Sequence, residues 1–236
     1  MVKQIQKAVG AYPDGIWGPA TTEAVKAFQR AHSLVPDGIA GLKTLAVMGI
    51  SALGSQEPPK SGQEGMMRFY SGQAITLRKS KRRIDYIAVH CTATPEGRSL
   101  TVDQIRTQHK AQGWSDIGYH YIIYRDGTVH AGRNVDISGA HVSGYNSYSI
   151  GVAYVGGLEN RPGVAYAQLK AKDTRTVAQK ASLLALLVDL RKLYPHAVIQ
   201  GHRDFSPDKN GDGIISADEW IKECPSFEAK TEYRNV

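Results

Sequence analysis

Cysteine is nearly absent from this chain of 236 residues, which contains only Cys91 and Cys224. Two cysteines exclude a framework of several disulfides, and they are better interpreted as metal ligands or free thiols than as one bridge. The sequence has no run that approaches the ~20 apolar residues needed to span a bilayer. The N-terminal stretch also lacks the apolar core of a secretory signal. We therefore expect a soluble protein that is made in the cytoplasm and needs outside help to leave the cell.

Acidic residues are fewer than basic ones, 22 against 29, and the formal net charge is +7. This charge suits an acidic partner, whether nucleic acid, an anionic envelope or an anionic polysaccharide, and it does not choose among them. Apolar residues make up 42% of the chain, which supports a packed core rather than disorder. The length allows one large domain, or a large domain and a small one.

A short repeat marks the N-terminal part of the chain. The pattern Asp-Gly-Ile-x-Gly begins at Asp14 and again at Asp37, and a threonine and helically spaced apolar residues follow each copy. Its glycines suit tight turns with positive φ, so residues 1–52 are expected to form a small all-α unit of three helices. This segment resembles the peptidoglycan-binding domain found at the ends of many cell-wall hydrolases. The alternative is two ordinary helix-entry turns in a helical bundle. Trp17, present in the first copy only, is more typical of a core than of an exposed sugar platform.

Residues 53–80 are predicted to be a linker. Ser51–Gly65, which overlaps the start of this range, is rich in serine, glycine, proline and glutamine. A basic run, Arg78–Arg83, leads into the next segment. Such a run either binds an anionic surface or is a solvated approach to the first strand.

From Ile84 onward, apolar strand patterns alternate with helical ones. This order predicts an α/β domain over residues 81–236, with a central mixed β-sheet flanked by helices. The expected elements include a first strand that ends at His90 and a long amphipathic helix that stops before Pro195. A short helix is expected over residues 216–223.

Three candidate zinc ligands lie where predicted strands end or shortly after them: His90, His202 and Cys224. Two imidazoles and a thiolate suit zinc, and three protein ligands leave one coordination position open for water. The spacing alone is a weak signal, because satisfied structural histidines are commoner than ligands. Side chains alternate along a strand, so Cys91 is expected to face away from His90 and to pack as a small apolar residue.

Five sequence blocks occur in a fixed order over residues 84–227: VHCTAT, GYHYIIYRDGTVHAGR, GAHVSGYNSYSIGVAYVGG, GHRD and CPSF. The series resembles the type 2 N-acetylmuramoyl-L-alanine amidases, particularly the phage lysozymes of the amidase type, whose fold also occurs in peptidoglycan-recognition proteins. The resemblance implies that His90, His202 and Cys224 bind zinc. It also implies that Tyr119 and Lys222 are catalytic.

These implied roles are chemically consistent. Zinc lowers the pKa of its bound water to about 7 and so provides hydroxide at neutral pH. A tyrosine hydroxyl or a lysine ammonium, here Tyr119 or Lys222, can stabilise the oxyanion that forms when hydroxide attacks an amide. The resemblance further implies that His141 and Asn146 line the substrate groove. His120 is expected to face the other way from Tyr119, into the core.

Twelve residues between the second and third candidate zinc ligands, Asp208–Glu219, fit an EF-hand calcium loop. Gly213 occupies the sharp turn at position six. The residues expected to bind calcium at positions one, three, five, seven, nine and twelve are Asp208, Asn210, Asp212, Ile214 through its carbonyl, Ser216 and Glu219. Oxygen ligands in this order suit calcium and not zinc. An acidic solvated turn is the alternative. If calcium fixes the helix expected after the loop, it also helps to place Cys224.

The combined features predict a modular phage endolysin with zinc and structural calcium. It would hydrolyse the amide between the lactyl group of N-acetylmuramic acid and the L-alanine of the stem peptide. We expect a monomer whose partner is bacterial peptidoglycan and not nucleic acid, and which reaches the wall through a membrane lesion. The alternatives are a non-catalytic peptidoglycan-binding protein on the same fold, a nucleic-acid-binding protein, and a zinc peptidase or glycosidase. No motif in the sequence indicates the pair of carboxylates that a glycosidase needs.

Overall fold

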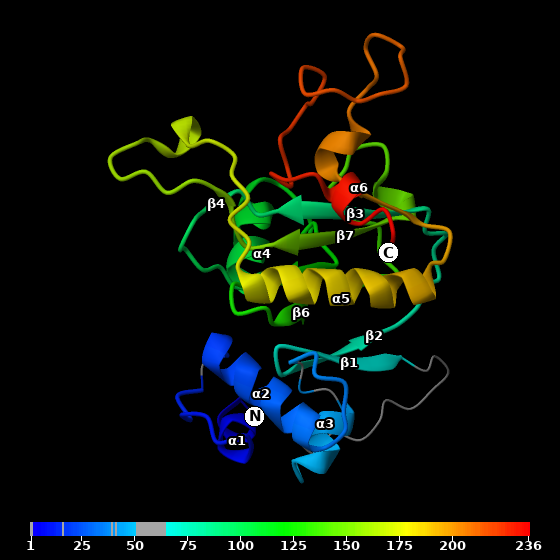
Figure 1. The fold of residues 1–236 in the computed structure, drawn as a ribbon. Helices are drawn as coiled ribbons and strands as arrows, with labels where there is room; N and C mark the ends of the chain where they lie inside the picture. Colours follow the sequence, from blue (N-terminus) through cyan, green and yellow to red (C-terminus); the bar gives the residue numbers. More distant parts are fainter. Residues whose placement is uncertain (1, 16, 39, 41, 51–64) are drawn as a thin grey trace.

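The computed structural model describes residues 2–15, 17–38, 40, 42–50 and 65–236. These residues form a helical N-terminal unit, a two-stranded hairpin and a larger α/β domain, which lie one above another in Figure 1. The fold class predicted from the sequence is therefore confirmed. Within the described ranges, no helix has both the length and the apolar character that crossing a bilayer requires.

Three helices form the N-terminal unit: α1 (Val2–Ala8), α2 (Pro19–Ala31) and α3 (Leu42–Val47). Proline suits the first position of α2, because the N–H that it lacks would have no partner inside the helix. The helices enclose an apolar core that includes Trp17, which is 8% exposed. This indole is therefore a core residue, as the sequence favours.

Two buried glutamines, Gln6 and Gln29, explain the Asp-Gly repeat, and the sequence analysis missed them. The side-chain oxygen of each accepts the N–H of the turn glycine, Gly15 or Gly38, at 2.8 Å. The amide nitrogen of each donates to the aspartate of the same turn at 2.7 Å. Both glycines have positive φ, +86° and +76°, which glycine adopts without strain. The two copies thus share one hydrogen-bond pattern that ties a turn to a helix.

A β-hairpin follows, made of β1 (Met66–Tyr70) and β2 (Gln73–Leu77) paired antiparallel. It corrects the prediction of a linker over residues 53–80, of which residues 53–64 lie outside the described ranges. Side chains alternate along β1, so Phe69 enters the core of the helical unit while Tyr70 enters the core of the α/β domain. The hydroxyl of Tyr70 donates to Asp189 at 3.0 Å, and Nε of Arg68 pairs with the same carboxylate at 3.0 Å.

The central sheet has five strands in the order β6-β5-β7-β3-β9. Its strands are β3 (Tyr86–Cys91), β5 (Tyr121–Ile123), β6 (Val129–Ala131), β7 (Ser149–Tyr154) and β9 (Val198–Gly201). β5, β7, β3 and β9 run parallel, and β6 is antiparallel to β5. The sheet is mixed, as predicted, and β3 lies between β7 and β9.

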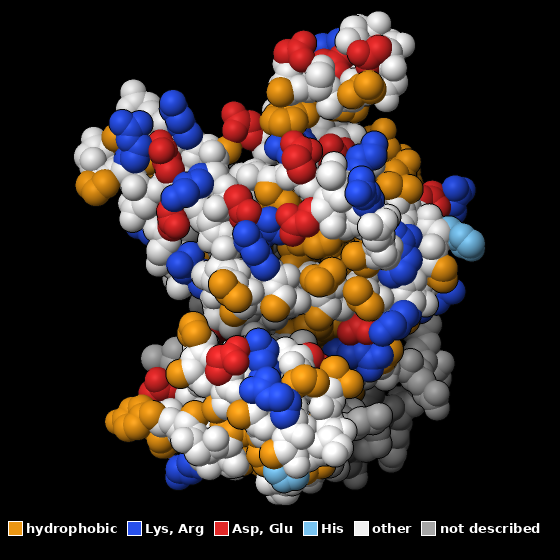
Figure 2. Space-filling view, viewed as in Figure 1, with side chains coloured by type: hydrophobic (Ala, Val, Ile, Leu, Met, Phe, Trp, Pro, Cys, Tyr) orange, Lys and Arg blue, Asp and Glu red, His pale blue; other side chains and the backbone are white. Residues whose placement is uncertain are grey.

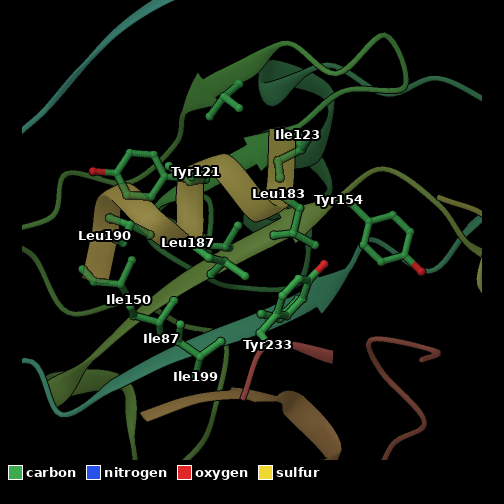
Figure 3. Packing of buried hydrophobic residues seen from close by; sticks show 14 of the residues in the cluster. Ile87, Tyr121, Ile123, Ile150, Tyr154, Leu183, Leu187, Leu190, Ile199 and Tyr233 are labelled. Atoms are coloured by element: carbon green, nitrogen blue, oxygen red, sulfur yellow. The ribbon is translucent and has the colours of Figure 1, made fainter. Parts of the chain in front are cut away.

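A helix covers each face of the sheet. α5 (Val177–Leu193) packs leucines such as Leu183 and Leu187 on one face, where they meet Ile123 and Tyr121 (Figure 3). α4 (Val102–Ala111) packs on the other face, where Ile105 meets Ile122. Because the β3 residues Ile87 to Cys91 are buried on both faces, the strand is apolar in sequence except at His90.

Short elements complete the described fold: β4 (Thr94–Pro95), β8 (Gly157–Leu158), η1 (Asn146–Tyr148), η2 (Tyr166–Gln168), η3 (His202–Phe205) and α6 (Ala229–Glu232). The short helix expected over residues 216–223 is wrong, because this segment consists of turns and bends. Its Glu219 carboxylate accepts backbone N–H groups of Lys209 and Ser216, which draws the segment back onto the loop instead of into a helix.

Candidate metal centre

The structure brings the three predicted zinc ligands together. The ligand atoms of His90, His202 and Cys224 all lie within 4.8 Å of one another, and Sγ of Cys224 is 3.6 Å from Nδ1 of His90. Because β3 and β9 are parallel neighbours with Val89 opposite Gly201, the residues that follow this pair, His90 and His202, meet at one edge of the sheet. Sheet pairing therefore places two of the three ligands.

The third ligand is held by the residues that follow the other two. The backbone N–H of Cys91 donates to Sγ of Cys224 at 3.3 Å, and that of Arg203 donates to the carbonyl of Cys224 at 2.9 Å. The guanidinium of Arg203 also lies over the ring of Trp220, 4.0 Å from its centroid, in a cation–π contact. Cys224 is thus fixed against both strand ends. The side chain of Cys91 packs in the main apolar core, as expected.

The protonation of these groups suits a metal. Burial lowers the pKa of His90 well below its usual range, and it lowers the pKa of His202 to about 4, so both imidazoles are neutral at pH 7. Burial raises the pKa of the Cys224 thiol, and a bound cation favours the thiolate instead. Two neutral imidazoles and one thiolate are a donor set that fits zinc.

A second histidine lies directly behind the first. Nε2 of His90 is 3.1 Å from Nδ1 of His141, and Nε2 of His141 is 3.5 Å from Oγ of Ser149. The Ser149 hydroxyl donates to the carbonyl of Tyr145 at 2.7 Å, so towards His141 its oxygen accepts a hydrogen bond from Nε2–H. Nδ1 of His141 is then an acceptor for the Nε2–H of His90. This order leaves the Nδ1 lone pair of His90 free to face the other two ligands.

The ring of His141 occupies a space that two glycines leave open. A Cβ at Gly139 or Gly151 would lie closer than 3.0 Å to this ring. Asn146 closes the loop around it, since its side-chain oxygen accepts the N–H groups of His141 and Val142 at 2.7 and 2.9 Å. These contacts give His141 and Asn146 supporting roles inside the loop. Their contact with the substrate stays a prediction. His141 is 6% exposed.

Tyr119 and Lys222 lie beside the predicted ligands. The ring of Tyr119 is 5.2 Å from that of His90, and burial raises the pKa of its hydroxyl, which therefore stays protonated as a donor. Lys222 is exposed, and its positive charge helps to lower the pKa of His202. The site therefore combines a neutral hydrogen-bond donor with a cation at the rim.

Residues 80–217 match the family model described as N-acetylmuramoyl-L-alanine amidase, and residues 2–48 match a model for a peptidoglycan binding domain. The chain belongs to the N-acetylmuramoyl-L-alanine amidase family. Its relatives include the endolysin of Klebsiella phage KP32, 42% identical over 64% of this chain and 85% of the relative. The endolysin of Escherichia phage T7 is 41% identical over 64% of this chain and 87% of the relative.

Solved structures similar to this amidase-family chain include the N-acetylmuramoyl-L-alanine amidase LysC from Clostridium intestinale. That similarity has a TM-score of 0.46 and 27% identity, and it covers 64% of this chain and 83% of the other. The Ph2119 endolysin from a Thermus scotoductus bacteriophage has a TM-score of 0.44 and 30% identity, with 63% and 80% of the two chains covered.

One residue near the site of this amidase-family chain carried no sequence signal. His109 of α4 accepts the N–H of Gly118 at Nδ1, 3.0 Å away, and its ring packs between Trp114 and Tyr119. It therefore supports Tyr119 from behind. Its helical position gave no hint of this contact, because the chain turns back after α4 and only this turn brings Gly118 and Tyr119 to the ring. His120 is a core residue, as expected, and its Nδ1 accepts the N–H of Gly151 at 2.9 Å.

The predicted calcium loop of this amidase-family chain closes on itself. The carboxylate of Glu219, which is 2% exposed, accepts the N–H groups of Lys209 and Ser216 at 2.7 and 2.9 Å. Asp208 accepts the N–H of Gly213 at 2.8 Å. In the described part of the chain, the only group of three or more His, Cys, Asp or Glu side chains spaced to hold a metal ion is the predicted zinc set. Calcium binding by Asp208, Asn210, Asp212, Ile214, Ser216 and Glu219 stays a prediction.

Proposed function

We propose that this chain is a modular endolysin that hydrolyses the amide between the lactyl group of N-acetylmuramic acid and the L-alanine of the stem peptide. The observation that carries the proposal is the convergence of His90, His202 and Cys224 at one edge of the sheet, in a member of the amidase family. A binding protein without catalysis has no need for this donor set. The match of residues 2–48 to a peptidoglycan binding domain supports the same substrate.

We propose zinc as the metal of this site. Bound by His90, His202 and Cys224, it would supply a Lewis acid for the amide carbonyl and a hydroxide at neutral pH. His141 holds the proton of His90 on Nε2, so that Nδ1 keeps its lone pair for the metal. Cys91 and Arg203 hold Cys224 in place through their backbone N–H groups.

Tyr119 and Lys222 are proposed to act on the substrate. The protonated hydroxyl of Tyr119 lies beside His90 and can donate to the oxygen that becomes negative when the carbonyl is attacked. The ammonium of Lys222 supplies a positive charge at the rim of the same site. Both groups lie close to the predicted ligands. The ring of Tyr119 contacts that of His90, and the charge of Lys222 lowers the pKa of His202.

The organisation of the chain follows from these assignments. Residues 1–52 are proposed to bind the wall and residues 81–236 to cut it, while the hairpin of residues 66–77 joins the two cores. We propose a monomer that acts on the wall after release through a membrane lesion made by a partner. The positive net charge favours approach to an anionic envelope.

Calcium binding by the loop of residues 208–219 is also part of the proposal. The ligand order of the sequence and the inward carboxylates of Asp208 and Glu219 support it. Trp220 follows the loop directly and packs on Arg203, so bound calcium would help to hold the segment that leads from the loop to Cys224. Isothermal titration of the metal-stripped chain with calcium tests this, with Asp212→Ala as the variant. Equal heats for both proteins would contradict calcium binding here.

The decisive experiment is digestion of purified peptidoglycan with mass spectrometry of the products. Glycan strands without peptides and stem peptides with a free L-alanine amine are expected, and Cys224→Ser should abolish both. A chelator should stop the reaction, and added zinc should restore it. New reducing sugar ends would point to a glycosidase, and binding without any product would point to a recognition protein.

A further inference from the structure

A cavity of about 450 Å³ lies between the helical unit and the α/β domain, where α2 faces α5. A furrow separates the lower and upper parts of the molecule on this face (Figure 2). Its lining comes from both parts and from the hairpin between them, and it includes none of the predicted zinc ligands. Its volume is in the range of small-molecule sites, roughly 300–1,000 Å³.

The walls of this interdomain cavity are largely apolar. Trp17 and Tyr70 offer their rings, because the indole N–H donates to Thr22 at 3.0 Å and the phenol hydroxyl donates to Asp189 at 3.0 Å. α5 contributes small side chains, Ala178 and Ala181 among them. Polar atoms of the two aromatic residues are therefore already paired inside the protein, and only their carbon surface is left for a ligand.

Two cationic side chains that line the cavity, those of Arg125 and Lys26, differ in their hydrogen-bond partners. The ammonium of Lys26 pairs with Glu23 at 2.8 Å. Nη1 of Arg125 is a buried atom that has no hydrogen-bond partner among the described residues. A buried guanidinium N–H without an acceptor is unfavourable, and its planar fork matches a carboxylate. Arg125 also lines the cavity, so it places there a guanidinium whose Nη1 has no hydrogen bond within the described part of the chain.

The position of Arg125 is fixed before any ligand arrives. Its carbonyl accepts a hydrogen bond from the hydroxyl of Thr176 at 2.7 Å. Arg125 lies inside the turn from Tyr124 to Gly127, in which the Gly127 N–H donates to the carbonyl of Tyr124 at 2.9 Å. A Cβ at Gly127 would overlap Ser71 of the hairpin and the start of α5. The turn is therefore clamped between two other elements, which lowers the entropic cost of binding.

We propose that this interdomain cavity binds the acidic stem peptide of the cell wall, with a peptide carboxylate on Arg125 and an alanine methyl group against Trp17 and α5. The choice of ligand rests on the proposed function, which makes the wall polymer the molecule that both modules meet. It is a second site for the polymer, separate from the metal centre. Holding one stem here would keep the enzyme on the strand whose other stems it cuts.

The test uses the full chain and the dipeptide L-alanyl-γ-D-glutamate, which contains no bond that the amidase could cut. The chain has three tryptophans, so their indole N–H signals in ¹⁵N NMR spectra are easily assigned. Trp17 reports on the cavity, and Trp114, which packs on His109, reports on the metal centre. We expect the Trp17 signal to shift in a saturable way with the dipeptide and not with its fully amidated form.

Two variants and one control decide the assignment. Arg125→Gln removes the charge and should weaken the binding seen at Trp17 by about tenfold or more, as loss of one charge-assisted contact predicts. Ala181→Phe keeps the charge but fills the cavity, so it should weaken the same binding by steric exclusion. Arg83→Gln removes an exposed guanidinium and should change nothing. Equal binding by all four proteins would overturn the proposal, as would an equal response to inorganic phosphate.

Peptide binding in the cavity and hydrolysis at the metal centre can be tested separately. Arg125→Gln should cut a small soluble muramoyl-peptide as fast as the parent chain, because Arg125 lies outside the metal centre. Cys224→Ser should lose this activity and still bind the dipeptide at Trp17. If the parent chain cuts no muramoyl-peptide at all, the proposed function fails, while the NMR titration still decides whether the cavity binds the peptide.

Discussion

Nε2 of His90 lies 3.1 Å from Nδ1 of His141, so the predicted metal centre has a second imidazole behind the first. Because the Ser149 hydroxyl donates to Tyr145, it acts as a hydrogen-bond acceptor towards Nε2–H of His141, and Nδ1 of His141 is then the acceptor for His90. His141 thus sets which nitrogen of His90 can bind a metal. Outer partners of this kind typically change metal affinity by about 10–100-fold when removed.

The first prediction concerns this pair. His141→Phe keeps a ring in the space beside Gly139 and Gly151 but removes the acceptor, so the zinc dissociation constant should rise about 10–100-fold. His141→Gln keeps an acceptor oxygen and should recover part of the loss. Competition with a chromogenic chelator measures both. The exposed His196→Ala is the matched control, and unchanged affinity in His141→Phe would refute the role of the pair.

Tyr119→Phe tests the second group near the metal. The variant loses only the hydroxyl, so zinc content and melting temperature should stay close to those of the parent chain. Hydrolysis should slow by about 10²–10³-fold, the usual effect of removing one oxyanion donor. Single-turnover rates on a soluble muramoyl-peptide give the number. A rate within a factor of about three of the parent, far below that expected loss, would remove Tyr119 from the reaction.

His120 should make folding stability depend on pH. Burial lowers its pKa to about 4 in the folded chain, whereas an unfolded histidine titrates near 6.5. Between these values the unfolded state binds more protons, so stability is full above about pH 6.5 and falls as the pH drops towards 4. The free energy of unfolding should fall by about 3 kcal/mol in total, since each unit of pKa difference corresponds to about 1.4 kcal/mol.

Urea unfolding at several pH values measures this loss. His120→Gln should lower stability at pH 7, because Gly151 and Ile137 lose a hydrogen-bond partner, and it should flatten the slope between pH 4 and 6.5. An unchanged slope in the variant would assign the acid sensitivity to other groups.

Asp189 should hold the hairpin to α5. Its carboxylate accepts the hydroxyl of Tyr70 and pairs with Arg68, each at 3.0 Å. Asp189→Ala leaves both without that partner and should destabilise the chain by about 1–3 kcal/mol. Limited proteolysis within residues 66–77 should also become faster. Asp103→Ala, at a side chain that is 90% exposed, should cost less than about 0.5 kcal/mol, and an equal effect of both would contradict this view.

Much of the site was predictable, because its residues lie in blocks that resemble a known family. The parallel pairing that joins His90 to His202 follows from apolar strands that alternate with helices, and both strands were recognised. The role of His141 was not predictable, because sequence places it in a loop and only packing shows that its ring lies behind His90. His109 likewise gave no signal, because only the way the chain turns after α4 brings its ring onto Tyr119, ten residues further on.

The two errors in the fold have local causes. The hairpin of residues 66–77 was hidden by the turn-rich stretch before it, although alternation of Phe69 and Tyr70 on opposite faces was a usable signal. Residues 216–223 have good helix formers, but the Glu219 carboxylate satisfies loop N–H groups and so overrides that propensity. Propensity decides such short segments only where no competing acceptor is near.

Adjacent residues of one short strand, Phe69 and Tyr70, end in two different cores. Because these neighbouring side chains are buried in separate cores, a rotation of the helical unit against the α/β domain would pull one of them out of its core. Under the proposed function, the orientation in which the helical unit holds the wall would therefore also set the orientation of the hydrolytic domain.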